Sequence, residues 1–245
     1  MNDPCSSPKP RNRPPENVGG ALGGPCGTLF VVATPIGNLE DITLRALRVL
    51  RDVAVIACED TRRTRALLTH FDIHTPTLSY FEHNKLTRGP QILRQLAEGA
   101  SVALVTDAGT PGISDPGFLL VRDARAAGVP VVPVPGSSAV VAALSAAGLP
   151  ADRFVFDGFP PVKPGRRVNR LTALRELDTT VVLYESPHRI LATLEAIEQV
   201  FGEREIVVAR ELTKQFEEIV RATPAAHLER LRATPPRGEF AVVIP

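Results

Sequence analysis

The stretch LVTDAGTPGISDPG, residues 104–117, decides how the rest of the chain is interpreted. An apolar run ends at Asp107, and three glycines, two prolines and a second acid follow at once. A plain connection from a strand to a helix needs only about 2–6 residues and one turn signal. Glycine has no Cβ and lets another molecule approach the backbone closely. The sequence therefore predicts a ligand-binding loop, with a plain crossover as the alternative.

Around this loop, short apolar runs alternate with helical patterns. We expect strands at residues 28–34, 53–59, 100–107 and 129–134. Helices are expected at residues 41–52, 61–71, 87–98 and 115–127, the second of them capped by Thr61. Apolar runs without polar alternation are typical of parallel strands that helices cover on both faces. The first half is therefore predicted to form a parallel α/β sheet.

The second half changes character. A small-residue helix at 135–148 is followed by strand candidates at 153–159, 179–185, 205–211, 217–223 and 239–245. A helix at 187–201 is expected, with Ser186 as its cap and Pro187 in its first position. The predicted fold class is α/β with two lobes, residues 28–136 with a mainly parallel sheet and 137–245 with a mixed sheet. A ligand cleft is expected between them.

Composition sets limits on the partners and the compartment. The net charge of +1 gives no overall field toward nucleic acid, so an anionic partner would need a local basic patch. Cys5, Cys26 and Cys58 have no metal-ligand spacing, and Cys58 is expected to be a small buried apolar side chain. Residues 1–27 are expected to be a disordered Pro/Gly-rich leader. No window reaches the roughly 18 apolar residues of a membrane span, and a cytoplasmic protein is predicted.

Three loops follow the carboxyl ends of first-half strands, where open parallel sheets bind ligands. These loops are residues 34–43, 57–64 and 106–117, and the PGSSA segment at 135–139 is placed to close the same crevice. None contains the glycine fingerprint of dinucleotide binding or the phosphate-cradling loop of nucleotide triphosphatases. Carbonyl oxygens, small residues and acids suit a cationic or hydroxyl-rich ligand better than a polyphosphate.

Eight ordered motifs over residues 28–245 resemble one family: ATPIGNLEDIT, CEDTRRT, HN at 83–84, VTDAGTPGISDPG, VPGSSAVVAALSAAGLP, YESPHRI, ARELTK and GEF. The chain is similar to the tetrapyrrole (corrin/porphyrin) methylase superfamily, and within it to the group that methylates small-subunit ribosomal RNA. The resemblance implies the tetrapyrrole methylase fold with S-adenosylmethionine between its lobes. It also implies a homodimer that methylates the ribose 2′-hydroxyl of a cytidine in the decoding region of 16S rRNA within the 30S subunit, without metal or membrane.

Motif matching carries the family's site onto this chain. The expected cofactor-binding residues are Pro35, Ile36, Gly37, Thr106, Asp107, Ala108, Ile113, Ser138, Ala139, Tyr184, Glu185 and Leu212. The candidates for accepting the proton of the hydroxyl are Lys214, ranked first, then Glu211, Glu59 and Asp60. Lys214 would serve only if burial lowered its pKa. The expected RNA-binding residues are Arg62, His83, Asn84, Lys163, Arg166, Arg167 and Arg170.

Each motif also has a purely structural interpretation. The arginines of CEDTRRT and the ELTK segment would then be solvated, Ser137 and Ser138 would only cap a helix, and His83 and Asn84 would form a turn. The basic stretch 160–170 would be a mobile Pro/Gly loop. Members of the family usually continue past GEF into a helical extension. They also tend to carry an acid where this chain has Lys85, so no role is carried over to Lys85.

Two other functions stay open at the level of sequence. One is methylation of a tetrapyrrole precursor on the same scaffold, which would need a cleft for a large polycarboxylate. The other is a catalytically silent RNA-binding module that keeps the cofactor pocket.

Overall fold

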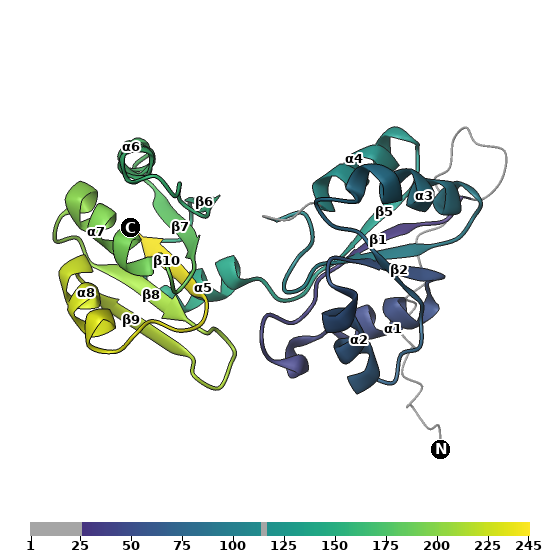
Figure 1. Cartoon of the computed structure of the whole chain (residues 1–245), viewed down its shortest axis with the longest axis horizontal. Helices are drawn as coiled ribbons and strands as arrows, with labels where there is room; N and C mark the ends of the chain where they lie inside the picture. Colours follow the sequence, from purple (N-terminus) through teal and green to yellow (C-terminus); the bar gives the residue numbers. More distant parts are fainter. Residues whose placement is uncertain (1–25, 114–116) are drawn as a thin grey trace, which may run out of the picture.

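The computed structural model describes residues 26–113 and 117–245, and these residues form two sheets in two separate lobes (Figure 1). The predicted leader therefore lies outside the described residues, except for its last two positions. The chain passes from the first sheet to the second through residues 135–138. We call the part up to residue 134 the first lobe and the part from residue 139 the second lobe.

The first lobe contains a five-stranded parallel sheet in the order β3-β2-β4-β1-β5. Its strands are β1 (Leu29–Val32), β2 (Val55–Cys58), β3 (Thr77–Ser79), β4 (Val102–Val105) and β5 (Val131–Val134). Its helices are α1 (Leu44–Asp52), α2 (Thr61–His70), α3 (Lys85–Ala97) and α4 (Gly117–Ala126), and a short 3₁₀ helix, η1, spans Leu39–Asp41. All four residues of β4 are buried, as the unbroken apolar run predicts.

Helices cover both faces of this sheet. Leu50 of α1 and Leu68 of α2 pack on one face against Ile56 and Cys58. On the other face, helices α3 and α4 pack against a separate apolar cluster that includes Leu104. Cys58 is fully buried, and burial raises the pKa of its thiol, as expected for a small apolar side chain.

The second lobe contains a mixed five-stranded sheet in the order β6-β7-β10-β8-β9. Its strands are β6 (Phe154–Gly158), β7 (Thr180–Glu185), β8 (Ile206–Arg210), β9 (Glu218–Ala222) and β10 (Phe240–Ile244), and only β6 and β7 pair in parallel. Its helices are α5 (Ala139–Ala147), α6 (Pro164–Arg175), α7 (Ile190–Phe201) and α8 (Pro224–Ala233). The predicted parallel and mixed sheets are thus both confirmed.

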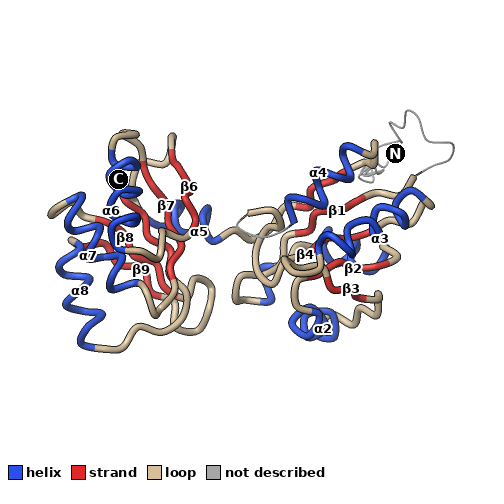
Figure 2. Tube along the Cα trace, turned by 45° about the horizontal axis from the view of Figure 1, so that its top comes forward, coloured by secondary structure: helices blue, strands red, loops and turns tan. Residues whose placement is uncertain are grey.

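The two faces of the second sheet differ in what covers them. Helices α6, α7 and α8 form one apolar cluster on the side away from the first lobe (Figure 2). Helix α5 covers the other face, and Ile36 of the first lobe packs against the same cluster as α5. The loop after β1 therefore reaches the apolar surface of the second lobe and joins the two lobes.

Several predicted details are corrected by the structure. Helix α2 is capped by Asp60, whose carboxylate accepts from the Arg62 N–H, and Thr61 is its first residue. Helix α7 begins at Ile190 after a turn, so Ser186 is not its cap. The expected loop at 160–170 contains the start of α6, with Pro164 in its first turn. Strand β3 and helix α8 were not predicted.

His227 of α8 is fully buried, and this burial gives the protein a pH dependence. Burial lowers the pKa of His227 from its ordinary 6.5, nearby Arg230 adds to the effect, and Glu218 and a bond to the Ile206 carbonyl oppose it. The unfolded chain therefore binds more protons than the folded one below about pH 6.5.

We expect the free energy of unfolding to fall as pH drops below about 6.5, by up to about 1.4 kcal/mol per pH unit from this group. Urea unfolding at about pH 7.5 and about pH 5.5 measures the difference. In a His227→Gln variant, the difference between the two pH values should shrink. An equal difference in both proteins would assign the pH dependence to other groups.

Within the residues that the structure describes, no helix is long and apolar enough to cross a membrane.

Candidate functional site

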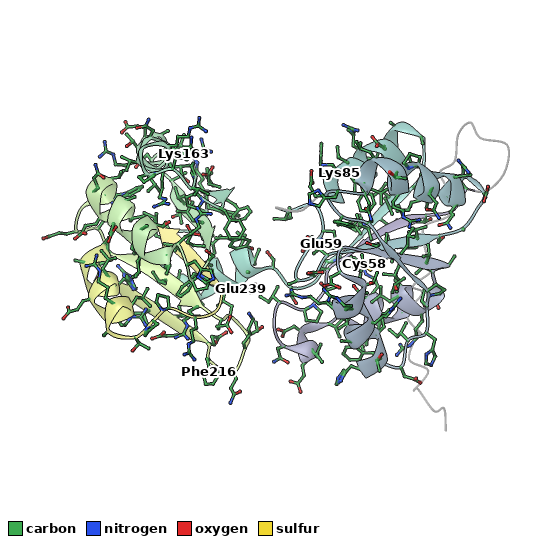
Figure 3. All side chains as sticks on the ribbon, viewed as in Figure 1. Cys58, Glu59, Lys85, Lys163, Phe216 and Glu239 are labelled. Carbon is green, nitrogen blue, oxygen red and sulfur yellow. The ribbon has the colours of Figure 1, made fainter. Side chains whose placement is uncertain are left out.

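A cavity of about 450 Å³ lies where the loops of the first lobe meet the second lobe. Most of its lining comes from the loop after β1, one face of α2 and the loop after β4, and Lys214 and Glu239 come from the second lobe. Figure 3 shows Glu59 of the first lobe and Glu239 of the second on facing sides of the two lobes. The volume lies within the range of about 300–1,000 Å³ that is usual for small-molecule sites.

Thr34 ties the loop after β1 to the glycine loop. Its backbone N–H donates to the Gly109 carbonyl at 2.9 Å, and the Gly109 N–H donates to the Thr34 carbonyl at 3.0 Å. The Thr34 hydroxyl donates to the Thr106 carbonyl at 3.1 Å. Gly109 has φ 84°, which a residue with a Cβ adopts only under strain. The two loops thus form one fixed wall of the cavity.

Asp107 links the glycine loop to helix α2. Its Oδ1 accepts from the Asp60 N–H at 3.0 Å, and its Oδ2 lies 3.4 Å from the Arg63 guanidinium. Asp60 in turn caps α2 and pairs with Arg62, and these bonds hold the pKa of Asp60 at about 2. Both oxygens of Asp107 are therefore occupied, and Asp60 is a weak proton acceptor.

Lys214 enters the cavity as a paired ammonium group. Its Nζ donates to Glu211 Oε1 at 2.7 Å and to Glu239 Oε2 at 2.9 Å. Burial alone would lower the pKa of Lys214, but the two carboxylates outweigh it and the pKa is raised. A lysine can act as the base only if its pKa is lowered, so the structure contradicts this role for Lys214. Glu211 also accepts from the Glu239 N–H, and despite partial burial these bonds lower its pKa.

Two glycines make room for this arrangement. A Cβ at Gly37 would lie 2.3 Å from Cγ of Lys214. A Cβ at Gly238 would lie 2.4 Å from the Glu211 carboxylate, and Gly238 also has φ 83°. The Lys214 stem therefore lies directly against the backbone of the first lobe.

The structure brings together half of the predicted cofactor-binding residues. Pro35, Ile36, Gly37, Thr106, Asp107 and Ala108 all line the cavity. Of the others, Ser138 caps α5 by accepting from the Val141 N–H, and Leu212 is buried in the apolar cluster under α5. Tyr184 packs against Phe156, next to α5 and Ala139. Ile113 is exposed at the end of the described part of the glycine loop.

The side chain of Glu185, a predicted cofactor-binding residue, is bound to the turn that follows β7. It is fully buried and accepts from the Ser186 N–H at 2.8 Å and from the Thr193 hydroxyl at 2.6 Å. The Arg189 guanidinium lies 3.4 Å from it. These bonds fix the turn between β7 and α7.

Several predicted RNA-binding side chains have partners within the protein. Arg167 is buried, and its guanidinium donates to the carbonyls of Pro161 and Val162. Arg170 forms a bidentate pair with Asp157. The Asn84 amide closes a turn by accepting from the Phe81 N–H.

The remaining basic candidates are open to solvent. His83 stands edge-on to Phe81, and the Arg62 side chain is exposed although it pairs with Asp60. Lys163 and Arg166 are exposed at the start of α6, which Figure 3 places at the end of the second lobe away from Phe216.

Seven residues of the cavity were not among the predicted site residues, namely Thr34, Leu39, Arg63, Thr64, Ala66, Leu67 and Glu239. The first four of them lie within the predicted ligand loops 34–43 and 57–64. Helical periodicity could have found part of this set, because residues three and four apart share a helix face. Arg63, Thr64 and Leu67 share the face of α2 that lines the cavity, whereas Arg62 lies outside the lining. In residues 26–113 and 117–245, no group of three or more His, Cys, Asp or Glu side chains could hold a metal ion.

Comparison with known proteins identifies the same family that the sequence motifs resemble. The family model "Tetrapyrrole (Corrin/Porphyrin) Methylases" matches residues 28–228. The ribosomal RNA small subunit methyltransferase I of Pseudomonas aeruginosa is 55% identical over 222 residues, 89% of this chain and 78% of that protein. The protein of the same name from Synechocystis is 48% identical over 219 residues, again 89% and 78% of the two chains.

Two solved structures share the fold at low identity. Cobalt precorrin-4 methyltransferase, a cobalamin biosynthetic enzyme, has a TM-score of 0.68 at 20% identity and covers 89% of this chain and 94% of its own. The uroporphyrin-III C-methyltransferase of Thermus thermophilus, solved in complex with S-adenosyl homocysteine, has a TM-score of 0.63 at 19% identity. The match covers 89% of this chain and 97% of that one.

Proposed function

The chain belongs to the tetrapyrrole (corrin/porphyrin) methylase family, and from this membership we propose that it is an S-adenosylmethionine-dependent methyltransferase of small-subunit ribosomal RNA. The finer proposal is methylation of the ribose 2′-hydroxyl of a cytidine in the decoding region of 16S rRNA, by a homodimer acting on the 30S subunit. The observation that carries the proposal is the interlobe cavity, whose lining includes residues 34–37 of the motif TPIGN and residues 106–108 of the motif TDAG.

The residues of the cavity fit S-adenosylmethionine. Small residues such as Ala108 line the wall formed by the glycine loop, and the missing side chain of Gly37 lets the Lys214 stem pack against the loop after β1. When bound, S-adenosylmethionine supplies an electrophilic methyl group on a positively charged sulfur atom. The chain's own contribution is to hold the acceptor hydroxyl against this group, and such positioning can contribute about 7–11 kcal/mol to catalysis.

The proton of the acceptor hydroxyl needs a base, and we propose Glu239 for this role. Lys214 is held as an ammonium group, and the carboxylates of Asp107, Asp60 and Glu211 are engaged as described above. Glu239 also pairs with Lys214 through Oε2, but unlike Glu211 it lines the cavity, and its side chain is 77% exposed. Glu59, which accepts from the Thr106 hydroxyl, is the second candidate.

A Gly37→Ala variant is expected to bind S-adenosylhomocysteine about 10- to 100-fold more weakly than the wild-type protein. The added methyl group can be accommodated only if Lys214 moves or the lobes separate, and misplaced methyl groups in binding sites cost about this much. Calorimetry measures the affinity. Gly165→Ala is the matched control, because nothing lies within 4 Å of its added Cβ. Equal affinities in all three proteins would show that the Gly37–Lys214 contact does not shape the site.

We propose that Lys163 and Arg166 contact RNA phosphates, since both are exposed, whereas Arg167 of the same stretch is buried and Arg170 pairs with Asp157. Replacing both by Gln should weaken RNA binding and reduce the slope of log affinity against log salt by about 1.4, at roughly 0.7 per contact with single-stranded RNA. Exposed Arg48 and Arg125 of the first lobe, replaced together by Gln, provide the control. An unchanged slope in the Lys163/Arg166 variant would remove the proposal.

Methyl transfer to unmodified 30S subunits tests the function as a whole. Tritiated S-adenosylmethionine should label the 16S rRNA, and mapping of 2′-O-methylation should place the label on a cytidine of the decoding region. Label on naked 16S rRNA alone would change the proposed substrate. Cofactor binding without any label on RNA would favour the silent RNA-binding module, and label on a tetrapyrrole precursor would favour the other rival.

A further inference from the structure

The turn between β8 and β9, residues 211–217, is built in an unusual backbone conformation. Glu211 has φ 50° and Thr213 has φ 67°, values in the left-handed region that residues with a Cβ rarely adopt. Hydrogen bonds brace the turn: the Lys214 N–H donates to the Glu211 carbonyl at 3.0 Å, and the Thr213 N–H donates to the Glu217 carboxylate at 2.5 Å. Strained conformations that the surroundings enforce are concentrated at functional sites.

This braced turn presents Phe216 to solvent. The Phe216 side chain is 67% exposed, and it lies two residues after Lys214, which lines the interlobe cavity. The turn projects from the second lobe on the side of the first lobe (Figure 1), and Figure 3 shows Phe216 at its outer edge. Phe216 is not part of the cavity lining, so it stands outside the space available to a cofactor.

The charges around the turn select which part of a nucleotide could bind there. Glu211 and Glu239 pair with the ammonium group of Lys214, and the Glu217 carboxylate accepts from the Thr213 N–H within the turn. With Arg210 as a second cation near Glu211, three carboxylates face two cations, which disfavours a phosphate. An uncharged aromatic ring can instead stack on the face of a base, which is how proteins commonly hold unpaired nucleotides.

We propose that Phe216 is a stacking platform for the base of the nucleotide that is methylated, held out of its RNA helix at the mouth of the interlobe cavity. This inference rests on the proposed RNA methyltransferase function. It names Phe216 as a positioning residue that none of the sequence motifs indicated.

The test compares Phe216→Ala, Phe216→Tyr and the wild-type protein on a decoding-region RNA. Phe216→Ala should lower RNA affinity and kcat/KM by about 5- to 150-fold, the effect of losing one base–aromatic stack. Phe216→Tyr keeps the ring and should stay within about threefold of the wild type. Phe154→Ala is the control. Phe154 is also an exposed phenylalanine of the second lobe, but it lies at the start of β6, paired with Thr180, and not in the turn between β8 and β9.

Two further measurements separate stacking from other roles. A fluorescent cytidine analogue at the acceptor position should be quenched on binding to the wild-type protein and not to Phe216→Ala. The affinity for S-adenosylhomocysteine should be equal in the two proteins. Unchanged RNA affinity, a loss confined to S-adenosylhomocysteine, or a change only in oligomeric state would each overturn the inference. A wild-type protein that methylates no RNA would instead overturn the proposed function.

Discussion

A Glu239→Gln variant is expected to methylate RNA at least about 100-fold more slowly than the wild-type protein, while its affinity for S-adenosylhomocysteine stays unchanged. A positioned base usually contributes about 100- to 10,000-fold to a rate. Glutamine has nearly the same shape and can still accept from Lys214 with its carbonyl oxygen, so the variant removes the basic carboxylate and little else.

Single-turnover kinetics on saturating RNA measures this effect. Glu229→Gln is the matched control, because Glu229 is an exposed residue of α8 that lies outside the cavity lining. Glu59→Gln tests the second candidate. If Glu59→Gln is slow and Glu239→Gln is not, the proton acceptor lies in the first lobe, and the role proposed for Glu239 is wrong.

A Glu185→Ala variant should lower the free energy of unfolding by about 3–5 kcal/mol, the largest effect on stability that we expect. Removing the fully buried carboxylate takes the counter-charge away from Arg189, whose side chain is 25% exposed and still donates to the Pro160 carbonyl. The Ser186 N–H and the Thr193 hydroxyl also lose their acceptor. Because these groups join β7 to α7, the loss should destabilise the second lobe first.

Urea unfolding followed by circular dichroism measures this loss. Glu195→Ala is the control, since Glu195 pairs with Arg232 on the surface, where such pairs contribute about 0–1 kcal/mol. Glu185→Gln should fall between the two variants, because an amide can still accept one hydrogen bond. A Glu185→Ala variant as stable as Glu195→Ala would contradict the structural role of this carboxylate.

The sequence predicted the elements whose signal is local and strong. Val102–Val105 is an unbroken apolar run and forms a central strand, and the helix with the Ile190 and Leu194 stripe is present within three residues of its predicted start. Strand β3 was missed because its three residues are only half-buried, which leaves no apolar run. Pro164 and Pro224 each occupy the first turn of a helix, where proline is favoured. The Pro/Gly content around Pro164 nevertheless favours a loop, and the sequence pattern does not predict α8.

The sequence motifs predicted which loop backbones line the cavity, but not the partners of the side chains in it. Gly37 and Asp107 line the cavity because the loops that carry them leave neighbouring parallel strands. The charge state of Lys214 was only partly predictable, since it depends on Glu211, three residues earlier, and also on Glu239, 25 residues further along the chain. Arg167 was assigned to RNA because burial of a guanidinium by carbonyls of its own loop leaves no trace in the sequence.

A crystal structure of the protein grown with saturating S-adenosylhomocysteine tests the central claim most directly. We predict that the adenosyl group and the sulfur will lie in the interlobe cavity, against the backbone of residues 34–37 and 106–108 and next to Lys214. S-adenosylhomocysteine bound elsewhere on the chain, or a cavity that stays empty at saturation, would contradict the assignment of this cavity as the cofactor site.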